Sequence, residues 1–123
     1  MDIGKRNDDY TFYEGYEGEK EIIITTPAIS YHIWDGYFED IFGNPAYDSN
    51  GWNGFTRDYN ECVNMFDDEQ VECAILPEEY LSDLNNYYDR EFTYDETKDV
   101  IKLLSDILGE TQKQNTSLLI RVN

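Results

Sequence analysis

The side chains rare enough to mark a site of nucleophilic or acid–base chemistry are one histidine, His32, and two cysteines, Cys62 and Cys73, since the 27 carboxylates are too abundant to be informative. A catalytic thiol would need a basic or glycine-rich setting that lowers its pKa. Cys62 falls instead on the inward stripe of a predicted helix, and His32 lies in an aromatic segment beside Tyr31 and Trp34. We therefore interpret both cysteines as buried thiols and expect no enzyme activity.

Metal and phosphate sites are not predicted either. The two cysteines, eleven residues apart, and the single histidine lack the closely spaced ligand pairs of zinc sites. A calcium loop starting at Asp48 would place Trp52 at its fifth position and Tyr59 at its twelfth, where oxygen ligands are needed. Gly51 and Gly54 lack the preceding strand and the lysine of a phosphate-binding loop. We expect neither a metal ion nor a cofactor.

Charge is the strongest signal, with 27 acidic and 9 basic residues and a formal net charge of −18 at pH 7. Such a surface repels nucleic acid phosphates and anionic membranes, so direct binding to either is disfavoured. Residues 67–99 alone hold 12 acidic and two basic residues, a balance of −10. A basic partner protein is favoured, and general solubility or adaptation to high salt is the alternative explanation.

The length of 123 residues and the 40% hydrophobic content indicate one compact acidic domain over residues 1–123. Residues 1–19 are expected to form an exposed strand or an irregular N-terminal arm. No apolar run approaches the roughly 18 residues that span a bilayer, and the first residues lack the apolar segment of a signal peptide. A cytoplasmic location is therefore expected.

Hydrophobic periodicity predicts the elements that must position any site. Strands are expected at residues 20–27, 70–77 and 117–123, and helices at residues 28–44, 52–66, 77–91 and 93–109. A turn over residues 45–53 is expected to aim the second helix. This order predicts an α/β (or α+β) fold in which a small, mostly three-stranded sheet packs against about four helices, with parallel pairing plausible because helices separate the strands.

A family resemblance adds to this interpretation. The stretch GNPAYDSNGWNGFTRDYNE, which follows the aromatic IWDGYFEDIF, resembles immunity proteins of bacterial contact-dependent growth inhibition and related polymorphic toxin systems. The resemblance covers roughly residues 30–66 and includes no catalytic motif. It implies a small cytoplasmic protein that binds and neutralises a cognate toxin domain, commonly a basic nuclease. Active-site occlusion and blocking from an adjacent exosite both remain open.

Partner-binding residues are nominated on charge and on the use of tyrosine at interfaces. They are Asp67, Asp68, Glu72, Glu78, Glu79, Asp83, Tyr87 and Asp89. The main alternative function is a phage-encoded nucleic-acid mimic, such as an anti-CRISPR or anti-restriction protein. A mimic should space its carboxylates along an extended face, whereas an immunity protein needs only a compact patch. An enzyme would instead require a concave site near His32 or Cys73.

Overall fold

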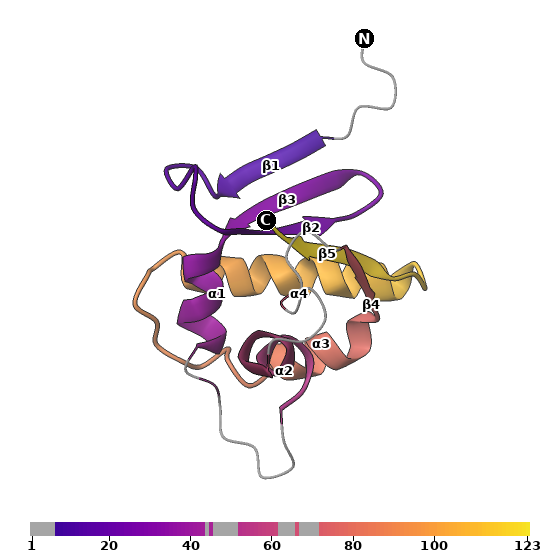
Figure 1. Ribbon diagram of the computed structural model, residues 1–123. Coiled ribbons are helices and arrows are strands. Elements are labelled where there is room, and N and C mark those ends of the chain that lie inside the picture. Colours follow the sequence, from indigo (N-terminus) through magenta and orange to yellow (C-terminus); the bar gives the residue numbers. More distant parts are fainter. Residues whose placement is uncertain (1–6, 44, 46–51, 62–65, 67–71) are drawn as a thin grey trace.

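The computed structural model describes residues 7–43, 45, 52–61, 66 and 72–123, which form a mixed α/β fold with its helices gathered on one side of a sheet (Figure 1). The elements in chain order are β1 (Asn7–Phe12), β2 (Glu21–Thr25), β3 (Ile29–Trp34), α1 (Asp35–Phe42), α2 (Gly54–Glu61), β4 (Cys73–Ile75), α3 (Pro77–Leu84), α4 (Thr97–Lys113) and β5 (Leu118–Val122). The predicted turn over residues 45–53 lies mostly outside the described residues.

The sheet has five strands in the order β1-β3-β2-β5-β4. The sequence predicted a mostly three-stranded sheet, so the number of strands was underestimated. The α/β (or α+β) class is confirmed. Pairing is antiparallel except between β1 and β3, which run parallel. β1 lies within residues 1–19, the segment predicted to be an exposed strand or an irregular arm.

The second additional strand, β3, corrects the helix predicted over residues 28–44. Ile33 lies in the core while Ser30 and His32 lie on the opposite face, which is the two-residue alternation of a strand. β3 pairs with β2 over five residues, from Glu21 opposite Trp34 to Thr25 opposite Ser30. The helical spacing of aromatic residues holds only from Trp34 onward, where α1 begins.

A tight turn that contains Pro27 joins β2 to β3. The chain therefore leaves β2 and returns as β3, which pairs with β2. The Thr26 N–H donates to the Ile29 carbonyl at 2.8 Å, and the Ile29 N–H donates to Thr26 Oγ1 at 3.0 Å. Pro27 lies within this turn, where its missing N–H breaks no ladder bond.

Helix α4 continues four residues beyond Gly109, where the sequence predicted its end. Apart from the adjoining backbone of α4, no atom of the described residues lies within 4 Å of the position that a Cβ of Gly109 would take. The buried stripe continues through Thr111, whose hydroxyl donates to the Ile107 carbonyl at 2.8 Å. Burial of this last turn outweighs the low helix propensity of one glycine.

The core is one cluster between the sheet and the helices. Isoleucines of β2 and β3 face aromatic and leucine side chains from all four described helices; among them are Ile22, Ile24, Ile33, Phe38, Phe42, Phe55, Leu84 and Leu104. The rings pack edge to face, as between Phe55 and Tyr80 at 4.7 Å between centroids. Among the described helices, none is long and apolar enough to cross a membrane.

Candidate functional site

The nominated partner-binding residues that the structure describes differ in their exposure. Asp67 and Asp68 lie outside the described residues. Glu72, Glu78 and Asp89 are exposed, and Glu79 is partly exposed. These side chains remain available to a partner.

Asp83 and Tyr87 were wrongly assigned to the surface, since their exposed fractions are 4% and 0%. The Thr56 N–H donates to Asp83 Oδ2 at 2.9 Å and the Thr56 hydroxyl donates to Oδ1 at 2.7 Å. The Tyr87 hydroxyl lies 2.7 Å from the same Thr56 oxygen. These groups fasten α2 to α3. The spacing from Tyr80 to Asp83, Leu84 and Tyr87 was the signal for burial, because it repeats as one helical face.

Gly54 makes this junction possible. Its φ is +54°, and a Cβ there would lie 2.9 Å from Asp83 Cβ and 3.2 Å from Tyr80 Cα. A larger residue would strain the backbone and push α2 away from α3. The glycine therefore allows Thr56 to reach the Asp83 carboxylate.

A second buried carboxylate, Asp58, lies in the same interface with no exposed surface. Arg57 donates to its Oδ1 from Nε at 3.0 Å and from Nη2 at 2.8 Å, and the Tyr80 hydroxyl donates to its Oδ2 at 2.5 Å. Arg57 also reaches Glu79 at 3.3 Å. Burial, followed by the contact with Asp58, raises the pKa of Tyr80, so the hydroxyl stays a donor. This network holds helices together and offers no open site.

His32 is also a structural link. Its Nε2 lies 2.9 Å from Asp8 Oδ1 and its Nδ1 lies 3.3 Å from Glu21 Oε2, so the imidazole connects β1, β3 and β2. Tyr10 stacks on the ring at 4.2 Å between centroids. Cys73 lies on β4, which β2 and β5 separate from β3, and burial raises the pKa of its thiol. His32 and Cys73 therefore do not form a thiol–imidazole pair.

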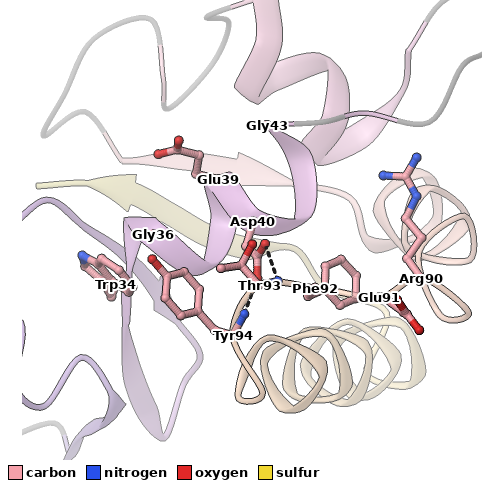
Figure 2. A pocket seen from close by; sticks show the side chains of 10 residues that line it. All are labelled: Trp34, Gly36, Glu39, Asp40, Gly43, Arg90, Glu91, Phe92, Thr93 and Tyr94. Atoms are coloured by element: carbon pink, nitrogen blue, oxygen red, sulfur yellow. Dashed lines mark hydrogen bonds between the residues drawn. The ribbon is translucent and has the colours of Figure 1, made fainter.

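Among the described residues, a cleft of about 750 Å³ lies between α1 and residues 90–94 (Figure 2). Carboxylates line it from both elements, and aromatic rings line it from residues 90–94 and from the end of β3, with one basic side chain. The lining residues are Trp34, Gly36, Glu39, Asp40, Gly43, Arg90, Glu91, Phe92, Thr93 and Tyr94. This acidic aromatic cleft was not predicted from the sequence, although the nominated Asp89 adjoins one of its walls.

Asp40 holds the two walls of the cleft together. The N–H groups of Thr93 and Tyr94 donate to its two carboxylate oxygens, each at 3.0 Å, and the Thr97 hydroxyl donates at 2.7 Å. Burial acts to raise the pKa of Asp40, but these hydrogen bonds together lower it. The carboxylate is therefore ionised at neutral pH, and it fixes the chain that leads into α4.

The aromatic wall is rigid because its rings pack on one another. Tyr16 stacks on Trp34 at 3.9 Å between centroids, and Tyr94 meets Trp34 at 5.3 Å and Tyr37 at 5.9 Å. A Cβ at Gly36 would lie 2.3 Å from the Trp34 ring. The indole can therefore occupy this position only because Gly36 has no side chain. Tyr94 is the exposed member of this group.

Replacement of Asp40 by alanine is expected to lower the free energy of unfolding by about 2 kcal/mol, because three donors lose one charged acceptor in a partly exposed setting. Urea denaturation measures this loss, and hydrogen exchange should show faster exchange of the Thr93 and Tyr94 amides. Glu39→Ala is the matched control, since Glu39 is an exposed neighbour and should change stability by less than about 0.5 kcal/mol. Equal effects of the two variants would contradict the role assigned to Asp40.

The described residues include acidic and aromatic side chains that converge on one cleft. Within them, no group of three or more His, Cys, Asp or Glu side chains is arranged to hold a metal ion. Comparison of the chain with family models, with curated proteins and with solved structures finds no match. The acidic aromatic cleft is therefore interpreted from its own side chains, which suit a cationic group.

Proposed function

We propose that this protein is an immunity protein of a bacterial contact-dependent growth inhibition (polymorphic toxin) system. It binds and neutralises a cognate toxin domain in the cytoplasm, and a basic nuclease is the kind of toxin that its charge suits. The acidic aromatic cleft is the observation that carries the proposal, because it combines negative charge with rigid apolar surface. The resemblance of residues 30–66 to such immunity proteins adds independent support.

Inhibition follows from ordinary electrostatics. A net charge of −18 attracts a positively charged toxin over long distances and raises the association rate. Once in contact, Glu39, Glu91 and Asp89 face the basic groups that would otherwise hold substrate phosphates. Aromatic anchors such as Tyr94 exclude water and slow dissociation. Occlusion of the active site, or of an adjacent exosite, then prevents the toxin from engaging its substrate.

A second exposed surface fits the same function. Leu76 precedes α3 with 73% of its surface exposed, and Glu78 and Glu79 follow it within the first turn. An apolar side chain among carboxylates resembles the centre of an interface with a polar rim. This surface extends the contact area that a toxin domain can use.

A pull-down from the native host tests the proposal. The tagged protein is used to capture partners from lysate, washed at low and then at high salt, and bound proteins are identified by mass spectrometry. We expect one basic toxin domain to be retained, and its purified activity to fall when the protein is added. Recovery of a CRISPR effector or a restriction enzyme instead would favour the nucleic-acid mimic and overturn the immunity proposal.

Charge-reversal variants assign the binding to a surface. The pair Glu39→Lys and Glu91→Lys is expected to weaken inhibition of the captured toxin. The matched pair Asp106→Lys and Glu110→Lys alters two exposed acids of α4 away from the cleft and should inhibit as the unaltered protein does. Equal loss in both pairs would mean that net charge alone determines binding.

A further inference from the structure

We propose that the acidic aromatic cleft receives a single basic side chain, an arginine or a lysine, of the bound partner. The inference rests on the proposed function for the identity of the partner, but the pocket itself can be tested without it. The charges around the cleft give the first argument. Glu39 lines the cleft from α1 and Glu91 from the opposite segment, with their carboxylates on opposite sides of it in Figure 2. Asp40, held by its three donors, supplies a third negative charge where the walls join.

Apolar surface lies beside these charges in the cleft. Arginine and lysine carry a long aliphatic stem, which needs apolar contact, and a cation, which is attracted to the face of an aromatic ring. Phe92 and Tyr94 line the cleft, and Tyr94 is exposed. The Trp34 ring is already stacked on Tyr16, so Trp34 supports Tyr94 and leaves it as the accessible ring.

The cleft is also large enough for such a ligand, and its walls are rigid. About 750 Å³ exceeds the volume of one side chain, so the cleft also has room for the flanking backbone of a partner loop. Its walls are fixed before binding by the hydrogen bonds of Asp40 and by the aromatic packing. Little conformational entropy is then lost when the ligand enters.

Arg90 provides an internal control on the charge argument. It lines the cleft, and its guanidinium carbon lies 5.0 Å from the centroid of the Tyr87 ring. Its positive charge opposes the entry of another cation. Replacing Arg90 by glutamine should therefore strengthen cation binding, whereas loss of Glu39 or Glu91 should weaken it.

The test is a titration of the ¹⁵N-labelled protein, followed by NMR, with the N-acetyl N-methylamides of arginine, lysine and citrulline. Citrulline has nearly the shape of arginine without its charge. We expect the two cationic amides to bind with a dissociation constant in the millimolar range, typical of ligands of this size. The shifted amide signals should include those of Thr93 and Tyr94, and citrulline should shift them little. The stronger of the two cations identifies the preferred side chain.

Matched variants locate the site. The pair Glu39→Gln and Glu91→Gln should weaken arginine amide binding about fivefold, as expected for two exposed charges, and Arg90→Gln should strengthen it about twofold. The pair Asp106→Asn and Glu110→Gln removes the same total charge and should leave binding unchanged. Equal shifts with citrulline, or equal weakening by both double variants, would overturn the pocket.

This experiment separates the two proposals. If the arginine amide binds in the cleft but no basic toxin is captured, the immunity proposal fails and the cation pocket stands. If a toxin is captured and inhibited equally well by the Glu39→Gln and Glu91→Gln variant, and the amide does not bind, the pocket fails alone.

Discussion

Replacement of Arg57 by methionine is expected to lower the free energy of unfolding by about 3 kcal/mol. The change leaves the Asp58 carboxylate, which has no exposed surface, without the two hydrogen bonds from the guanidinium. Removing one partner of a buried ion pair costs about 3–5 kcal/mol, and the low end applies because the Arg57 side chain is itself 32% exposed. Methionine retains most of the aliphatic stem, so the loss reports mainly on the charge. Urea denaturation at pH 7 measures it.

Two further variants give this result its meaning. Lys102→Met removes an exposed positive charge from α4 and shows how much stability is lost through net charge alone. Adding Asp58→Asn to the Arg57 variant removes the buried negative charge and should recover more than half of the loss. A similar decrease for Arg57→Met and Lys102→Met would refute the buried ion pair as the cause.

Replacement of Asp83 by asparagine is expected to stabilise the protein by about 2–3 kcal/mol at pH 7 and to have little effect below pH 4. Burial is the largest cause that raises the pKa of Asp83 to about 6, against the opposing hydrogen bonds from Thr56. An unfolded chain has the ordinary value of 3.8. Between these values the folded state binds more protons, so stability falls as the pH rises, by at most about 3 kcal/mol.

Asparagine can keep the local hydrogen bonds. Its Oδ1 accepts from the Thr56 N–H, its Nδ2 donates to the Thr56 hydroxyl, and that hydroxyl then donates to Tyr87. The measurement is the difference in unfolding free energy between variant and unaltered protein from pH 3.5 to 7.5, in which the other acids cancel. Asp106→Asn makes the same change of charge at an exposed position and should show little pH dependence. A constant difference for Asp83→Asn would disprove the raised pKa.

Helices and strands whose hydrophobic residues follow one clear period were largely predicted from the sequence. β2 and β5 appear within a few residues of their expected ranges. Pro77 begins α3 as expected, although α3 ends at Leu84, seven residues before the predicted end at residue 91. β3 was missed because Ile, Tyr and Trp suit both strands and helices, and the helical spacing after Trp34 extended the predicted helix backward. The pairing with β2 decides between the two-residue period of a strand and the period of a helix. That pairing depends on the tertiary structure and cannot be read from the local sequence.

The candidate site was harder to predict for the same reason. The acidic aromatic cleft joins α1 to residues 90–94, which are far apart in the sequence, and Asp40 looks like any solvent-facing acid of a helix. Asp83 was misplaced because its charge received more weight than its position on the apolar face of α3. In a chain with 27 acidic residues, charge alone cannot separate a structural carboxylate from one at an interface.

The interior position of β5 in the sheet has a consequence for biosynthesis. β5 lies between β2 and β4, so β2 gains its second neighbour only after residue 122 has been made. The local β2–β3 hairpin can form on the nascent chain, but its unpaired edge and the isoleucines of β2 stay uncovered until then. Pairing across such a long separation is slow and leaves the intermediate prone to aggregation. The fold is therefore completed only once β5 has been synthesised, and the open edge of β2 is exposed to aggregation until then.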